Sequence, residues 1–243
     1  MKGATPEGAR DEQEAAHCVR GMFARVAHRY DLANHLLSFN IDRHWRNHTV
    51  RRLRPLLQKP GARVLDICCG TGDLALALAR GRGATVLASD FCHPMLNAAH
   101  AKASRRHAPV CLVEADALRL PLGDASFDVV TVAFGFRNLA NYAAGLEEMR
   151  RILRPGGVAA ILEFSEPPGA LFASLYHFYS RRMLPWIGGA LSGNRDAYTY
   201  LPESVRRFPR AGQLADDMRR ARFAAVHYEY LTGGIVALHL GTA

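Results

Sequence analysis

Long hydrophobic runs, paired cysteines and lysine are what this 243-residue sequence has little of. No apolar run approaches the ~20 residues of a membrane-spanning helix, and the first eleven residues lack the apolar segment of a secretory signal. The five cysteines form no C-x-x-C pair and no Cys/His cluster with zinc spacing, so we expect neither a disulfide framework nor a metal site. These absences predict reduced thiols and a cytoplasmic location.

What is present is typical of a folded globular protein, since 49% of the residues are hydrophobic and 22% are charged. A chain of this length can bury a core without disulfides or metal. We find no linker, internal repeat or low-complexity tract. The sequence therefore predicts a single domain over residues 1–243.

The net charge of +9 is unevenly distributed. Residues 1–60 carry 11 basic and 6 acidic side chains, residues 61–169 carry 11 of each, and residues 170–222 carry 9 basic and 4 acidic. Of the 31 basic residues, 28 are arginine. Basic segments on both sides of a neutral middle can attract nucleic acid or an anionic lipid surface, or can serve solubility alone.

The neutral middle alternates apolar runs with helical stretches. Strands are expected at residues 63–67, 84–89, 109–113, 127–134 and 158–164, and helices at 73–80, 95–106 and 142–153. Continuous apolar strands alternating with helices predict a parallel sheet covered on both faces. Near the end of the chain, a tight turn joins a run at 223–231 to one at 235–240, which predicts an antiparallel final hairpin.

Two segments fall outside this alternation. Residues 12–58 carry apolar side chains at steps of three or four and are predicted to form an N-terminal helical cap. Residues 170–222 begin with an aromatic, apolar run and are predicted to form a helical insertion over the substrate. The cofactor-binding core is then expected at 61–165 and the terminal hairpin at 223–241.

A glycine turn, Gly70-Thr71-Gly72, follows the first predicted strand at the edge where open α/β sheets bind ligands. It lacks the third glycine of a dinucleotide-binding motif and the lysine of a P-loop. Asp90 ends the next strand and can accept both ribose hydroxyls. Asp116 follows the third strand and can accept an adenine amino group, with the Ala117 amide beside it. These strand ends predict an S-adenosylmethionine pocket, and the alternative is an ordinary α/β core.

Seven segments then carry a resemblance to a known family. They are FARVAHRYDLANHLLS (23–38), GTGD (70–73), FGFRN (134–138), EMRRILRPGG (148–157), LEFSEP (162–167), YTYLPESV (198–205) and GGIVALH (233–239). The sequence resembles the ubiquinone/menaquinone biosynthesis C-methyltransferases over about residues 20–241. The Arg-Asn and Tyr-Leu-Pro signatures are more specific than the glycine turn, which many methyltransferases share.

The resemblance implies a class I methyltransferase fold, Rossmann-like, with strand order 3-2-1-4-5-7-6 and an antiparallel last strand. It implies C-methylation of a polyprenylated hydroquinone, either demethylmenaquinol or a methoxy-polyprenyl-benzoquinol. Ala133 stands where the family often has serine, and Cys68-Cys69 and Phe136 also differ from the commonest family residues. The expected cofactor residues are Asp66, Gly70, Thr71, Gly72, Asp90, Met95, Asp116, Ala117 and Ala133.

Methylation of a ring carbon requires charge to move onto that carbon as the neighbouring hydroxyl loses its proton, so the site needs a proton acceptor and a stabilised oxyanion. We predict that Arg137 supplies the positive charge, that Asn138 orients a water or the hydroxyl, and that Tyr30 contacts the ring hydroxyl. The alternatives are a structural salt bridge for Arg137 and a core role for Tyr30. His177 is a further candidate base.

The insertion suggests a route for the prenyl tail. Its apolar side chains could line a channel from the bilayer while Arg181, Arg182 and Arg195 face lipid phosphates; the channel candidates are Leu171, Phe172, Leu175, Phe178, Met183, Leu184, Trp186 and Ile187. We therefore expect peripheral binding at the inner face of the cytoplasmic membrane. The alternative is a lid in a homodimer.

Rival functions are methylation of RNA or a small phenol, and a non-catalytic scaffold. We expect no nucleic-acid partner, because no RNA-binding module is present.

Overall fold

The computed structural model describes residues 3–169 and 195–243, apart from residues 5, 7, 29 and 82. Its centre is a seven-stranded sheet of order β3-β2-β1-β4-β5-β7-β6, which confirms the predicted topology. The strands are β1 (Arg63–Ile67), β2 (Thr85–Asp90), β3 (Val110–Glu114), β4 (Phe127–Ala133), β5 (Leu153–Phe164), β6 (Ala224–Leu231) and β7 (Val236–Thr242).

Parallel pairing joins the first five strands, and antiparallel pairing joins β7 to β5 and to β6. In the parallel part the register aligns Ile67 with Ser89, and Asp90 with Glu114. The carboxyl ends of β1, β2, β3 and β4 therefore meet at one edge of the sheet, where α/β folds place ligands.

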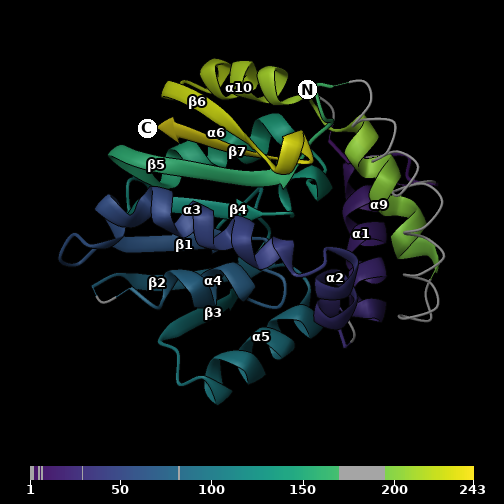
Figure 1. Cartoon of the computed structure of the whole chain (residues 1–243), viewed down its shortest axis with the longest axis horizontal. Coiled ribbons are helices and arrows are strands. Elements are labelled where there is room, and N and C mark those ends of the chain that lie inside the picture. The colour runs from purple at the N-terminus through teal and green to yellow at the C-terminus, as the bar shows by residue number, and fades with distance from the viewer. Residues whose placement is uncertain (1–2, 5, 7, 29, 82, 170–194) are drawn as a thin grey trace.

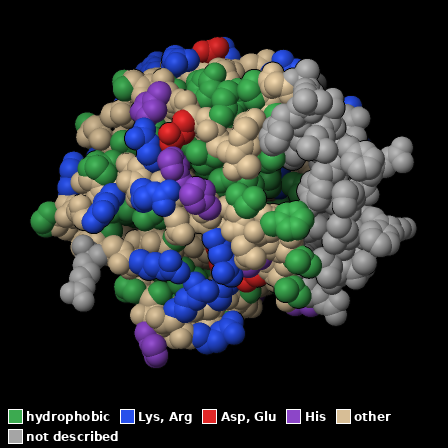
Figure 2. Space-filling model, viewed as in Figure 1, with side chains coloured by type: hydrophobic (Ala, Val, Ile, Leu, Met, Phe, Trp, Pro, Cys, Tyr) green, Lys and Arg blue, Asp and Glu red, His purple; other side chains and the backbone are tan. Residues whose placement is uncertain are grey.

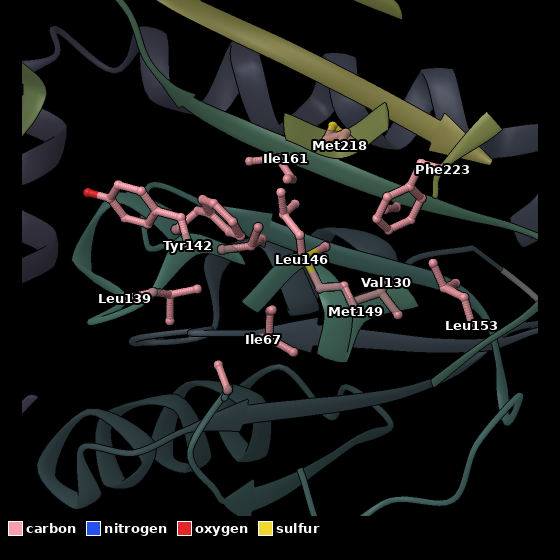
Figure 3. Close-up of a cluster of buried hydrophobic side chains, with 14 of the residues drawn as sticks. Ile67, Val130, Leu139, Tyr142, Leu146, Met149, Leu153, Ile161, Met218 and Phe223 are labelled. Carbon is pink, nitrogen blue, oxygen red and sulfur yellow. The ribbon is translucent and has the colours of Figure 1, made fainter. Parts of the chain in front are cut away.

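Helices cover both faces of the sheet. They are α1 (Glu12–Val26), α2 (Tyr30–Leu37), α3 (Ile41–Leu57), α4 (Asp73–Leu78), α5 (His93–Arg105), α6 (Tyr142–Ile152), α9 (Arg195–Arg207) and α10 (Ala211–Arg220), with short 3-10 turns η1 (Phe136–Asn138) and η3 (Thr232–Gly234). The helices α3 and α4 pack with one apolar cluster, and α6 and α10 pack with another on the opposite face. Figure 3 shows part of the second cluster, where Leu146 and Met149 of α6 approach Ile161 of β5 and Met218 of α10.

Three helices lie beyond the carboxyl ends of the parallel strands rather than on a face. Figure 1 shows α1, α2 and α9 grouped at that end of the sheet. The apolar stripe of α1 buries Val19, Met22 and Val26, and Asp11 caps its first turn by accepting a hydrogen bond from the Glu14 amide. These helices are therefore placed to cover whatever binds at the strand ends.

The basic character of the N-terminal segment appears on the surface of α3. Figure 2 shows Lys, Arg and His side chains spread over the face on which α3 lies, with few acidic ones between them. Exposed apolar side chains occur nearby on α2 and on the turn that follows it, at Leu32, Leu36 and Phe39. In the described part of the chain, no helix combines the length and apolarity needed to cross a bilayer.

The structure differs from the sequence prediction at the start of β5. We expected the helix to run to Leu153 and the strand to begin at Val158, after Pro155-Gly156-Gly157. Instead, the helix ends at Ile152 and the strand begins at Leu153, which pairs with Phe127. A register irregularity between Phe127 and Val129 accommodates the proline and glycines within the pairing.

The predicted insertion is described only in part. Within residues 195–222, α9 contacts η1 and α1, whereas α10 packs on β6 and β7 as part of the main core. The tail-channel candidates, together with His177, Arg181 and Arg182, lie in residues 170–194, outside the described part of the chain.

Candidate active site

A cavity of about 940 Å³, its open mouth included, lies at the carboxyl ends of the parallel strands. Among the predicted site residues, those lining it are Tyr30, Asp66, Gly70, Thr71, Asp90, Met95, Asp116, Ala117, Ala133 and Asn138. The structure thus brings most of the predicted cofactor residues together around one cavity.

The glycine turn owes its shape to residues with positive φ. Cys68 has φ 48°, Gly70 has φ 55° and Gly72 has φ 82°. The turn is tied to β2, because the Asp90 carboxylate accepts hydrogen bonds from the Gly70 amide at 2.8 Å and the Cys92 amide at 2.9 Å. Burial raises the pKa of Asp90, while these amides oppose the rise. Two strand ends and the turn therefore form one rigid unit.

Gly72, although predicted to bind the cofactor, lies behind the cavity wall. A Cβ at this position would come within 3.2 Å of the Ala99 Cβ on α5. Its role in the structure is to let the turn approach α5 with a left-handed backbone.

Asp66 lies on the cavity wall, and only one of its two carboxylate oxygens is hydrogen-bonded. Its Oδ1 accepts a hydrogen bond from the Thr131 hydroxyl at 2.7 Å, whereas Oδ2 is buried and has no partner among the described residues. Burial raises the pKa of Asp66 to about 7, against the effect of the Thr131 bond. An unpartnered buried oxygen on a cavity wall is the kind of atom that a bound donor would satisfy.

Asp116 is the most open of the predicted acidic groups. One of its oxygens accepts a hydrogen bond from the Leu118 amide at 2.9 Å, and the side chain is exposed at the cavity rim. Ala117, next to it, is buried in the wall, and Met95 approaches from α5. Asp66, Asp90 and Asp116 thus lie at or just beyond the carboxyl ends of the neighbouring strands β1, β2 and β3.

Tyr30 lines the cavity from the start of α2, with its ring packed edge-on against Phe23. Burial raises the pKa of Tyr30, although nearby Arg137 and a hydrogen bond with the Asn34 side chain oppose the rise. The phenol therefore stays protonated at neutral pH and can donate a hydrogen bond.

Asn138 lines the cavity at the end of η1. Its side-chain oxygen is buried and lacks a hydrogen-bond partner within the described chain.

Arg137 is buried, and it does not line this cavity. Its Nη1 lies 2.9 Å from Glu163 Oε1 and also donates to the Phe134 carbonyl, while Nε donates to the Ser204 hydroxyl at 3.2 Å. The guanidinium also sits over the Phe164 ring. The structure thus contains the salt bridge that the sequence analysis gave as the alternative role for this residue.

Several cavity residues were missed by the sequence analysis. Ala16, Val19 and Phe23 come from the apolar stripe of α1, and Arg46 comes from α3. The spacing of apolar residues in α1 predicts an amphipathic helix, but it does not predict which part of the sheet or which ligand the apolar face covers. Arg46 pairs with Asp42 of its own helix.

The thiols at the turn contribute no nucleophile. Burial raises the pKa of Cys68 and of Cys69 well above the ordinary value.

One group with metal-ligand composition occurs among the described residues, namely His35, Asp42 and Asp73. Arg46 and Lys102 already pair with the two carboxylates.

Comparison with known proteins decides the family. The model of the ubiE/COQ5 methyltransferase family matches residues 9–243. The chain belongs to the ubiE/COQ5 methyltransferase family. This confirms the resemblance found in the sequence and identifies the chain as a methyltransferase.

Its relatives in this family are similar over nearly their whole length. The demethylmenaquinone methyltransferase of Thermus thermophilus is 49% identical over 221 residues, which cover 90% of this chain and 99% of that protein. Proteins of the same name from Deinococcus radiodurans and Mycobacterium marinum are 46% and 47% identical, covering 95% and 92% of this chain and the same shares of their own.

Solved structures of more distant methyltransferases share the fold. A SAM-dependent methyltransferase from Thermotoga maritima is 20% identical with a TM-score of 0.66, covering 91% of this chain and 98% of its own. One from Aquifex aeolicus is 19% identical with a TM-score of 0.57, covering 80% of this chain and 88% of its own. At these identities the similarity concerns the fold alone.

Proposed function

We propose that this methyltransferase transfers a methyl group from S-adenosylmethionine to a ring carbon of demethylmenaquinol, producing menaquinol. The observation that carries the proposal is the common name of relatives that match this chain nearly end to end. The equivalent ubiquinone step, on a methoxy-polyprenyl-benzoquinol, is the second candidate, because the resemblance found in the sequence implies either quinol.

The residues of the cavity fit S-adenosylmethionine. The molecule carries donors along its length: an adenine amino group, two ribose hydroxyls and an ammonium group. The wall offers acceptors in a matching series, with Asp116 at the rim, Asp90 beside the glycine turn and the unpartnered Oδ2 of Asp66 deeper inside. We propose that these three carboxylates hold those three groups in that order. When bound, the cofactor supplies an electrophilic methyl group on a sulfonium.

The side chains at the far part of the wall suit a phenolic ring. We propose that Tyr30 donates its hydroxyl proton in a hydrogen bond to the ring oxygen, because its raised pKa keeps the phenol protonated. Asn138 would offer its free side-chain oxygen to the ring hydroxyl or to a water. The aromatic and aliphatic wall around them would exclude bulk water and hold the carbon close to the methyl group.

Arg137 enters this proposal through its neighbours. Its backbone amide donates to Glu163 Oε2 at 3.1 Å, and its side chain ties η1 to β5 and α9. We propose that it fixes the 3-10 turn that carries Asn138 and adds positive charge behind the ring site.

A turnover assay with both quinols tests the substrate. Purified enzyme receives S-adenosylmethionine with short-tailed demethylmenaquinol or with the benzoquinol analogue, and mass spectrometry follows the gain of one methyl group. We expect turnover with demethylmenaquinol to exceed that with the benzoquinol. Faster methylation of the benzoquinol would assign the ubiquinone step. Binding of the cofactor without methylation of either quinol would refute the substrate class and direct the search to RNA and small phenols.

We further propose that the enzyme works at the inner face of the cytoplasmic membrane, where its substrate tail resides. Supporting features are the basic surface over α3 and the exposed Leu32, Leu36 and Phe39 beside the cavity end of the sheet. Flotation with vesicles tests this: binding to anionic vesicles and loss of binding at high salt are expected, and no binding with or without quinol would refute it. Sedimentation of the protein without vesicles would test the alternative, a homodimer.

A further inference from the structure

A charge network centred on Lys102 joins the glycine turn to the helix that begins at Tyr30. Lys102 lies on α5 and is 9% exposed. Its ammonium nitrogen is 2.7 Å from Asp31 Oδ2, 2.7 Å from Asp73 Oδ1 and 3.0 Å from Thr71 Oγ1. No role described above uses this lysine.

The three contacts use all the donors that an ammonium group has. The Thr71 hydroxyl, which accepts one of them, itself donates to Asp31. Asp31, Thr71 and Lys102 thus form a closed triangle, with Asp73 attached to it. Burial raises the pKa of Asp73, but the positive charges of Lys102 and Arg46 outweigh this effect and bring the pKa below its ordinary value. The network therefore favours the charged form of the Asp73 carboxylate beside the buried Lys102 side chain.

Polar contacts help to hold the helix α2, beside the packing of Tyr30 against Phe23 and the contact of His35 with Asp42 at 2.8 Å. None of its described side chains is fully buried, and Leu32 and Leu36 point their apolar surface outward, 65% and 48% exposed. An eight-residue helix is not stable alone, so contacts with the rest of the molecule must hold it. Asp31, in its first turn, supplies the contact to Lys102 and Thr71.

We propose that Lys102 is a positioning residue for methyl transfer. By holding Asp31 against Thr71, it fixes the first turn of α2 and with it the Tyr30 side chain on the cavity wall. It acts through Asp31 and does not touch the substrate. This inference rests on the proposed function in one respect, the contact between Tyr30 and the ring of the substrate.

The test compares Lys102→Met, Asp31→Asn and the double variant with the wild type. The matched control is Lys59→Met, the same substitution at an exposed lysine after α3. Hydrogen–deuterium exchange of the ligand-free protein is read in α2, with α6 as internal reference. Calorimetry measures the affinity for S-adenosylhomocysteine, and steady-state kinetics with demethylmenaquinol measure kcat.

In Lys102→Met we expect exchange in α2 to rise about tenfold while exchange in α6 stays unchanged. We expect kcat to fall about tenfold or more because the ring contact is misplaced, with affinity for S-adenosylhomocysteine reduced less than about threefold. The double variant should lose no more kcat than Lys102→Met alone, because both substitutions break the same contact. Lys59→Met should match the wild type in every readout.

Unchanged exchange in α2 would overturn the inference, as would a double variant whose loss of kcat equals the product of the single losses. If Lys102→Met fails to fold, Asp31→Asn carries the same test with the same expected directions. Exchange and calorimetry need no quinol, so a wrong substrate proposal would show as absent turnover in the wild type while leaving these two readouts decisive.

Discussion

Nη1 of Arg137 lies 2.9 Å from Oε1 of Glu163, and both side chains are buried. Glu163 also accepts hydrogen bonds from the Arg137 and Phe164 amides. Burial alone would lower the pKa of Arg137, but the Glu163 carboxylate raises it above its ordinary value. Arg137 therefore stays charged, and its contacts with Glu163 fix η1 on β5, next to the cavity.

Replacing Arg137 with methionine should destabilise the protein by about 3–5 kcal/mol, because Glu163 would be left as a buried unpaired charge. Urea unfolding followed by circular dichroism measures this change. The control is Asp216→Asn, which breaks an exposed ion pair with Arg219 and should shift the free energy of unfolding by less than about 1 kcal/mol. Equal changes in the free energy of unfolding for the two substitutions would show that the buried pair stabilises the protein no more than the exposed one.

Asp66 should make a contribution to the stability of the ligand-free protein that is lost as pH rises from about 4 to about 7. Burial raises the pKa of Asp66 to about 7 in the folded state, against about 3.9 when unfolded. Its contribution to stability is therefore fully present below about pH 4 and is lost as pH rises through about 7. Buried His239, whose pKa is lowered to about 4, changes stability in the opposite direction over this window, so the test is the difference between variant and wild type. The melting temperature of Asp66→Asn should rise relative to that of the wild type as pH increases. A variant that follows the wild-type curve would refute the assignment.

Asp116 offers the cleanest test of the cofactor site, since it is exposed and makes few contacts of its own. Asp116→Asn keeps an oxygen for the Leu118 amide but removes the charge that we assign to the adenine amino group. Affinity for S-adenosylhomocysteine, measured by calorimetry, should fall about tenfold. Glu147→Gln, an exposed change on α6, should leave the affinity as it is. An unchanged affinity in Asp116→Asn would remove this residue from the site.

The wall at η1 depends on a close approach between Gly135 and Cys68. A Cβ on Gly135 would lie 2.5 Å from the Cys68 Cβ, so Gly135→Ala should cost about 1–3 kcal/mol of stability. Adding Cys68→Gly should recover much of this loss, because it removes the clashing atom at a residue whose φ is 48°. Thermal melts of the single and double variants measure both effects. A double variant as unstable as Gly135→Ala would contradict the contact.

The residues that the sequence placed at strand ends are those that the structure brings together around the cavity. Asp90 ends β2 and Asp116 lies two residues after β3, and both line the cavity because parallel strands bring their carboxyl ends together whatever the details of packing. The strand order came from the family resemblance, and the structure confirms it.

What the sequence could not predict depends on how distant segments meet. The partner of Arg137 is 26 residues away and is chosen by the register of β4 against β5. Lys102 looks like any polar residue of a surface helix until α2 and the glycine turn are placed around it. The start of β5 was missed because Pro155-Gly156-Gly157 is typical of a helix stop, and only the pairing with Phe127 shows that the strand includes it.

The most direct test of the account is to identify the atom that receives the methyl group. The enzyme is incubated with S-adenosylmethionine carrying a ¹³C methyl group and with short-tailed demethylmenaquinol, and the product is examined by carbon NMR. The account predicts one labelled methyl on a ring carbon, produced by the wild type and reduced about tenfold in Lys102→Met. A labelled methyl on the hydroxyl oxygen, or no labelled quinol while the cofactor binds, would contradict it.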